Sequence, residues 1–213
     1  MSNSKLVGPE LAAIDVQGMT RQSFMMRGAV AAGAVYGMGA VGPFVRQALA
    51  QGGGGDVEIL NFALTLEYLE AAFYTQALKD TKGLSGDVKK LATTLRDNEV
   101  EHVDALTAAI KDGGGMPVEA PGVDFGDAFA SQDSFLKLAQ TFEDLGVSAY
   151  NGAAVEIQSK DILAAAGGIV QVEARHAAAI RSLRGQPITP GAFDEALAKD
   201  KVLEAAKPFI KAA

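Results

Sequence analysis

The protein has 213 residues, of which 48% are hydrophobic and 21% charged, and this composition is sufficient for a folded core. A formal net charge of -7 provides no basic stripe to neutralise phosphates, which argues against nucleic-acid binding. The absence of cysteine excludes disulfides, thiolate metal sites and a cysteine nucleophile.

The first 51 residues have the pattern of an export signal. They carry a net positive charge, and Arg21 precedes an uncharged run over residues 28–45 that is rich in alanine, glycine and valine. The sequence Ala48-Leu49-Ala50 then has the small-x-small pattern of a cleavage site. This arrangement resembles a twin-arginine signal, although Gln22 stands in place of the second arginine. We therefore expect an exported protein, periplasmic or at the cell surface, by this route or the general secretory route.

Two alternatives to a cleaved leader remain for residues 1–51. About 18 apolar residues is the lower limit for spanning a bilayer, so a retained leader would anchor the protein and contact the membrane through residues 28–45. Its glycines weaken this interpretation because they lower hydrophobicity and helix propensity. The third interpretation is an ordinary buried helix. Residues 52–55, all glycine, are expected to form a flexible linker.

Residues 56–184 are expected to form four long helices. Apolar side chains recur at helical spacing in this part of the chain, and glycine or proline follows the ends of three of the segments. The predicted helices run from Asp56, which is expected to be the N-cap, to about Asp80, from about Ser85 to Gly113, from about Ser131 to about Ile157, and from Ser159 to about Leu183. Residues 185–213 are expected to form a tail with a short amphipathic helix over about 193–210.

The lengths of the connections predict the topology. Short loops join the first helix to the second and the third to the fourth, which indicates two antiparallel hairpins. Residues 113–131 contain several glycines and prolines and are long enough to cross from one end of the bundle to the other. The sequence thus predicts an all-α, ferritin-like four-helix bundle with one long crossover, plus an apolar N-terminal leader helix and a short C-terminal helix.

The two histidines of the chain each follow a glutamate by three residues, as Glu99 with His102 and Glu173 with His176. Residues three apart share a helix face, so each pair can direct a carboxylate and an imidazole at one point. Glu67 and Glu143 lie near the middle of the other two predicted helices, at the same level of an antiparallel bundle. Four carboxylates and two imidazoles suit two transition metal ions, which would also offset the cost of burying the acids.

A second regularity supports a duplicated hairpin. Tyr74 follows Glu67 by seven residues and Tyr150 follows Glu143 by seven, so each tyrosine shares the face of its glutamate. We expect the tyrosines to be core aromatics or to support the metal ligands. Glu70, three residues after Glu67, is expected on a solvated flank; the alternatives are that it replaces Glu67 as a ligand or supports it.

The segment at 64–74 reads LTLEYLEAAFY, and together with the two Glu-x-x-His pairs it resembles the ferritin-like superfamily. In particular, the chain is similar to an exported bacterial ferritin-like domain family related to desiccation-associated proteins, over about residues 56–184. Bacterioferritins, rubrerythrins and manganese catalases use similar six-ligand sites. The resemblance implies the metal ligands Glu67, Glu99, His102, Glu143, Glu173 and His176. By the same analogy, Glu99 and Glu173 would bridge the metals, and each histidine would bind one of them.

These patterns favour an exported protein that holds two iron ions, with manganese or zinc as alternatives, and reacts with O2 or peroxide. Ferrous oxidation or peroxide removal would follow, with Fe(II), O2 or peroxide as substrates. The main alternative is a structural or interaction protein in which the metal site stabilises the bundle and the apolar N-terminus anchors it. A manganese catalase is a third hypothesis. We also expect a homo-oligomer.

Overall fold

The computed structural model describes residues 54–211, and this part of the chain is helical, with no β-strand longer than an isolated bridge. The predicted all-α fold is confirmed for these residues. The elements are α3 (Gly54–Asp80), α4 (Gly86–Asp112), η2 (Gly126–Phe129), α5 (Gln132–Ala154), α6 (Lys160–Leu183), α7 (Lys199–Ala206) and η3 (Lys207–Phe209).

Serine caps define where three of the long helices begin. The hydroxyls of Ser85, Ser131 and Ser159 each accept a hydrogen bond from a backbone N–H in the first turn of α4, α5 and α6. At the other end of α4, Gly114 adopts φ 74°, a left-handed conformation that favours glycine and turns the chain out of the helix. These local signals place the helix boundaries close to those predicted.

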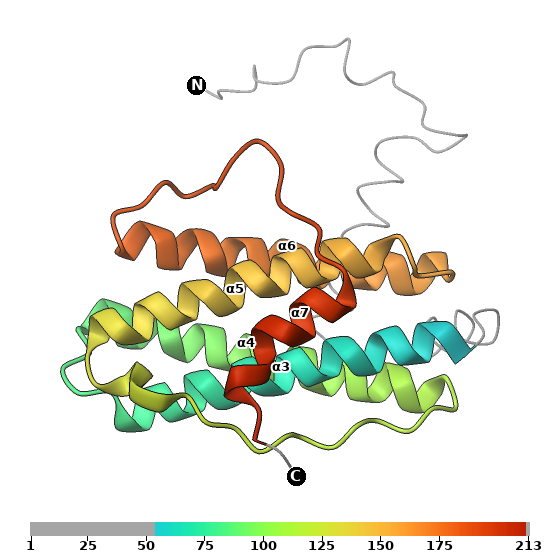
Figure 1. Ribbon diagram of the computed structural model, residues 1–213, viewed down its shortest axis with the longest axis horizontal. Helices are drawn as coiled ribbons and strands as arrows, with labels where there is room; N and C mark the ends of the chain where they lie inside the picture. The colour runs from blue at the N-terminus through green and yellow to red at the C-terminus, as the bar shows by residue number, and fades with distance from the viewer. Residues whose placement is uncertain (1–53, 212–213) are drawn as a thin grey trace, which may run out of the picture. The chain divides into compact units, whose positions relative to one another are not determined.

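The four long helices pack as two antiparallel hairpins. α3 packs chiefly against α4, and α5 packs chiefly against α6. The crossover after α4 runs along the length of the bundle before η2, so that α5 starts at the opposite end from α4's C-terminus (Figure 1). The core includes an aromatic cluster around Phe73, whose ring lies 5.0–5.5 Å from those of Tyr74, Phe125, Phe129, Phe135 and Phe142.

The C-terminal segment straps the bundle and is less helical than predicted. Residues 186–198 are irregular because Pro187 and Pro190 disfavour helix and because Leu197 N donates to Ser148 O on α5 at 3.0 Å. The helix predicted over 193–210 is therefore limited to the eight residues of α7, followed by the short η3 turn. Beyond it, Lys211 N donates to Gly122 O, which ties the chain end to the crossover.

Two further helix boundaries differ from the prediction. α3 begins at Gly54, so two of the four predicted linker glycines lie in its first turn. Asp56 does not cap its own helix; its buried carboxylate accepts hydrogen bonds from the amides of Gln158 and Ser159, both at 2.9 Å. Because this contact holds the α5–α6 turn in place, α5 ends at Ala154 rather than near Ile157.

The predictions for the leader, its cleavage site and residues 52–53 lie outside the described residues. Within residues 54–211, no helix has both the length and the apolar character needed to cross a membrane.

Candidate metal centre

Four glutamates lie at one level of the bundle, each near the middle of a different helix. Glu67 and Glu99 are the central residues of the 27-residue helices α3 and α4, and Glu143 is the central residue of the 23-residue helix α5. Glu173 lies near the middle of α6. All four are buried, with at most 1% of their surface exposed. The helical bundle therefore brings four acids into its interior, where they need a cationic partner.

His102 lies at the centre of one group of donor atoms. Its Nδ1 is 3.1 Å from Glu67 Oε2, 3.0 Å from Glu99 Oε2 and 3.0 Å from Glu173 Oε1. A metal ion with donors about 2.1 Å away and at right angles holds neighbouring donors about 3.0 Å apart. The observed spacings match that value, so these four side chains fit one ion.

His176 lies in a second group that shares two acids with the first. Its Nδ1 is 2.9 Å from Glu99 Oε1, 3.3 Å from Glu143 Oε2 and 3.8 Å from Glu173 Oε2. Glu99 and Glu173 thus direct one oxygen to each group. The two imidazole rings lie 6.4 Å apart and nearly parallel. This arrangement fits two neighbouring ions joined by two carboxylates.

Several buried atoms of the two groups have no hydrogen-bond partner among the described residues. They are Glu99 Oε1, Glu143 Oε2, both carboxylate oxygens of Glu173, and His176 Nδ1. Buried polar atoms are rarely left unpaired in folded proteins. These atoms approach one another without hydrogen-bond geometry, as expected of donors that face a shared cation.

The burial of so many ionisable groups shifts their pKa values strongly. Burial raises the pKa of Glu99, and although both histidines pull it down, it remains at about 7. Burial lowers the pKa of His176, but the carboxylates of Glu143 and Glu99 outweigh this and raise it to about 11. The pKa of His102 is also raised, because Glu173, Glu67 and Glu99 outweigh its burial. The raised pKa values mean that Glu99, His102 and His176 retain their protons to higher pH than usual when no cation is bound.

Glu67 and Glu143 each belong to only one donor group, and a tyrosine hydroxyl donates a hydrogen bond to Oε1 of each. Tyr150 Oη on α5 donates to Glu67 Oε1 on α3 at 2.5 Å, and Tyr74 Oη on α3 donates to Glu143 Oε1 on α5. In each glutamate the other oxygen, Oε2, faces a histidine. The tyrosines therefore orient one free oxygen of each acid toward its group and join α3 to α5. Both are buried core aromatics as well.

The prediction that Glu70 lies on a solvated flank is wrong. Only 3% of its surface is exposed, and its carboxylate lies near Glu173, because Gly146 on α5 leaves room for both. Burial raises the pKa of Glu70 well above its usual value, and the charges of Glu173 and Glu99 add to the shift. Helix periodicity places Glu70 at the edge of the buried face of α3. It is buried because Gly146, the residue opposite on α5, has no side chain.

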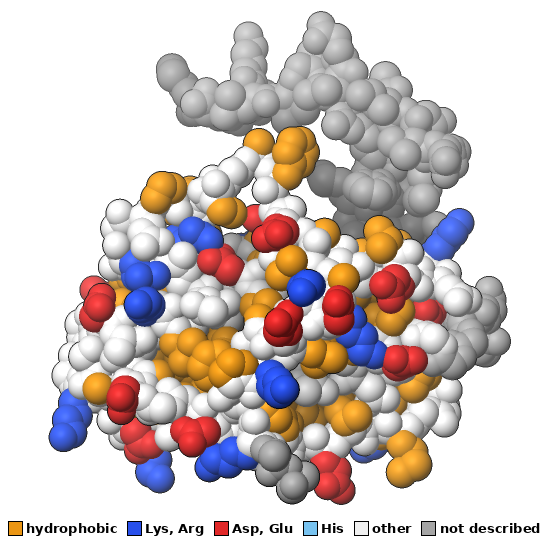
Figure 2. Space-filling view, in the orientation of Figure 1, with side chains coloured by type: hydrophobic (Ala, Val, Ile, Leu, Met, Phe, Trp, Pro, Cys, Tyr) orange, Lys and Arg blue, Asp and Glu red, His pale blue; other side chains and the backbone are white. Residues whose placement is uncertain are grey.

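Sequence reasoning did not identify Asn98, whose Nδ2 lies 2.9 Å from Nε2 of His176. Histidines that bind metals commonly have a polar partner at the second ring nitrogen, which fixes the ring orientation. Asn98 comes directly before Glu99, and nothing in the spacing distinguishes it from other polar residues of α4. Neither histidine is visible on the face shown in Figure 2, where acidic and basic side chains are interspersed.

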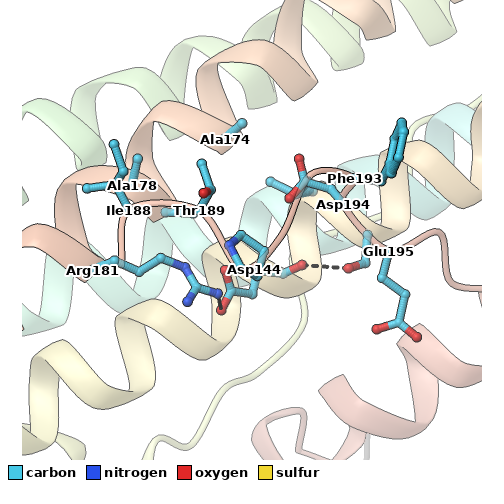
Figure 3. Close-up of a pocket in the computed structure, with 13 residues that line it drawn as sticks. Asp144, Ala174, Ala178, Arg181, Ile188, Thr189, Phe193, Asp194 and Glu195 are labelled. Carbon is cyan, nitrogen blue, oxygen red and sulfur yellow. Dashed lines mark hydrogen bonds and ion pairs between the residues drawn. The ribbon is translucent and has the colours of Figure 1, made fainter. Parts of the chain in front are cut away.

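A cavity of about 340 Å³ lies elsewhere, between α5, α6 and the irregular segment 186–198, which we call the C-terminal strap. None of its lining residues belongs to either donor group. Within it Arg181 pairs with Asp144, as Figure 3 shows, and Asp194 and Glu195 also line the wall, so its charged side chains are mostly acidic. Phe193 at its rim is 93% exposed. The cavity is thus separate from the buried acids and histidines.

Comparison with known proteins adds one finding to this geometry. Residues 55–186, more than half of the chain, match the sequence profile of a family described as a ferritin-like domain. No curated protein matches the sequence. The matched region contains both donor groups, from Glu67 to His176.

Proposed function

Because this chain belongs to the ferritin-like domain family, we propose that it is a two-metal carboxylate protein, with iron as the metal, that reacts with O2 or peroxide. One observation carries the proposal: two groups of four buried donors share Glu99 and Glu173. The proposed ligands are those that the sequence predicted: Glu67, Glu99, His102, Glu143, Glu173 and His176.

Oxygen and nitrogen donors suit iron, manganese or zinc, and the chain offers no thiolate for softer metals. A bound pair of iron ions supplies two electrons to O2 or peroxide. The protein's part is to hold the ions together and to keep the surroundings dry. Glu99 and Glu173 hold both positions, Tyr74 and Tyr150 orient the free oxygens of Glu143 and Glu67, and burial excludes bulk water.

The test is aerobic titration of the metal-free protein with Fe(II), monitored by O2 consumption and by elemental analysis. We expect two iron ions per chain and O2 uptake that accompanies oxidation of the bound Fe(II). The Glu99→Ala variant loses an oxygen from both positions and should bind no pair. Glu101→Ala on the exposed side of the same helix is the matched control and should behave as the parent. A parent protein that binds no metal would refute the proposal.

A structural role is the second candidate, and the distribution of the donors favours it. Each group takes side chains from both hairpins, so bound ions would join them whether or not chemistry follows. Two metals per chain and a higher melting temperature without O2 or peroxide consumption would support this role. Rapid O2 evolution from peroxide by the manganese-loaded protein would instead identify a catalase.

We also propose that the protein is exported with its leader removed. The support is the charge and cleavage pattern of residues 1–51. Mass spectrometry of the protein isolated from cells should then find an N-terminus near Gln51. An intact N-terminus in a membrane fraction would instead support the retained anchor.

A further inference from the structure

The two halves of the metal centre are related by an internal duplication. Glu67, Tyr74, Glu99 and His102 of the first hairpin correspond to Glu143, Tyr150, Glu173 and His176 of the second. The reciprocal bonds from Tyr74 to Glu143 and from Tyr150 to Glu67 follow this symmetry. The symmetry fails at Glu70, which follows Glu67 by three residues, because its counterpart after Glu143 is Gly146.

The missing side chain at Gly146 and the extra carboxylate at Glu70 are parts of one arrangement. A Cβ placed on Gly146 would lie 3.3 Å from Glu70 Oε1 and 3.5 Å from Glu173 Oε2. The carboxylate of Glu70 therefore lies close to the space that a side chain on α5 would occupy. It lies on the side of Glu173 Oε2, the oxygen that belongs to the His176 group.

Within the described residues, Glu70 accepts no hydrogen bond and forms no ion pair, although only 3% of its surface is exposed. A buried carboxylate without a partner either keeps its proton or takes a cation, and the donor group beside Glu70 offers a place for one. The spacings around His176 Nδ1 extend to 3.8 Å, whereas those around His102 Nδ1 do not exceed 3.1 Å. The His176 group is therefore the more loosely spaced of the two.

We propose that Glu70 is a further metal ligand, which gives a carboxylate oxygen to the ion held by Glu143 and His176, and that Gly146 admits it. This inference rests on the proposed two-metal function. The His102 position then has four protein ligands and the His176 position five. Asn98 reinforces the difference, because it contacts Nε2 of His176 while its counterpart before Glu173 is the apolar Val172. The ion at the His176 position should therefore bind first and more tightly.

The experiment is titration of the metal-free full chain with Co(II), followed by calorimetry and visible absorption. We expect the parent to bind two ions in two steps whose affinities differ by at least about tenfold. In Glu70→Gln the tighter step should weaken by about tenfold or more, while the other step changes little. The visible absorption per Co(II) should rise, because absorption intensifies as the coordination number falls. Glu101→Gln, on the exposed side of α4, is the control and should match the parent.

The outcomes separate this inference from the function on which it rests. A parent that binds no Co(II), Mn(II) or Fe(II) overturns the two-metal function itself. A parent that binds two ions, with Glu70→Gln identical to it in both steps, overturns only the role of Glu70. If Glu70→Gln does not fold, Gly146→Ala decides the question. Its methyl group crowds the carboxylate, so a weakened tighter step supports the inference, and an unchanged titration overturns it.

Discussion

Replacing Tyr150 by phenylalanine removes the hydroxyl that donates to Glu67 Oε1 at 2.5 Å and keeps the ring in the core. Replacing Tyr74 does the same to Glu143. Each variant leaves a buried carboxylate oxygen without its donor and frees the glutamate to rotate. Because Glu67 faces only His102 and Glu143 faces only His176, each change should act on one metal position.

The expected loss of metal affinity follows from the hydrogen bond that each variant removes. A hydrogen bond to a charged group contributes about 1.5–3 kcal/mol. Mutation of a residue that orients a metal ligand typically costs about 10–100-fold in metal affinity, which equals about 1.4–2.8 kcal/mol. The two figures agree, so we expect each Tyr→Phe variant to weaken one of the two binding steps by about 10–100-fold.

Calorimetric titration with Mn(II) or Co(II) resolves the two steps. One step should weaken in Tyr150→Phe and the other in Tyr74→Phe. Tyr68→Phe is the matched control, because Tyr68 is adjacent to Glu67 but half-buried and makes no hydrogen bond with a described residue. The reasoning is refuted if both variants weaken the same step, or if neither differs from Tyr68→Phe.

Three further predictions concern stability, and a fourth concerns the pH dependence of metal affinity. In scanning calorimetry, the metal-free protein should melt at lower temperature as the pH rises from 5 to 9, because the folded state loses protons that it binds more tightly than the unfolded state does. The pKa of Glu99 is raised to about 7, so its contribution to stability is complete below the pKa of the unfolded state and is lost as the pH rises through 7. The pKa of His176 is raised to about 11, so its contribution to stability is lost between the pKa of the unfolded state and pH 11. Metal affinity should rise over the same range, with proton release, and a flat pH profile would contradict this. Asp56→Ala should lower the free energy of unfolding in urea by about 3 kcal/mol, since two amides of the α5–α6 turn lose their acceptor, whereas a loss below about 0.5 kcal/mol would show that the contact is unimportant. Gly152→Ala should cost about 1–2 kcal/mol in the same assay, because its Cβ would lie 1.8 Å from Leu197 O and displace the strap, while Gly168→Ala, with open space around it, should be neutral or stabilising.

The parts of this structure that follow helical periodicity could be predicted from the sequence. Serine caps and the glycines that follow the helices place the four long helices, and the spacing of Glu99 from His102 and of Glu173 from His176 puts each pair on one face. Mid-helix positions of Glu67 and Glu143 bring them to the same level. These rules need only the geometry of a single helix and the antiparallel arrangement of neighbours.

The features that escaped prediction depend on contacts between segments far apart in the chain. Glu70 is buried because of Gly146 on another helix, and Asn98 matters because His176 lies beside it. Asp56 is an acceptor for the α5–α6 turn, about a hundred residues away, rather than a cap of its own helix. Comparing the duplicated halves residue by residue would have drawn attention to Glu70, since its counterpart, Gly146, has no side chain.

The sharing of Glu99 and Glu173 between the donor groups has a mechanical consequence. Most helix packing lies within each hairpin, and comparatively little joins α3 to α5 or α4 to α6. An ion at either position would be held by side chains from both hairpins and would therefore strengthen the weaker contact between the two hairpins. If the protein binds metal as proposed, metal starvation would leave the contact between the hairpins weaker and more open to proteases, and the amount of the protein in a cell would follow the supply of that metal.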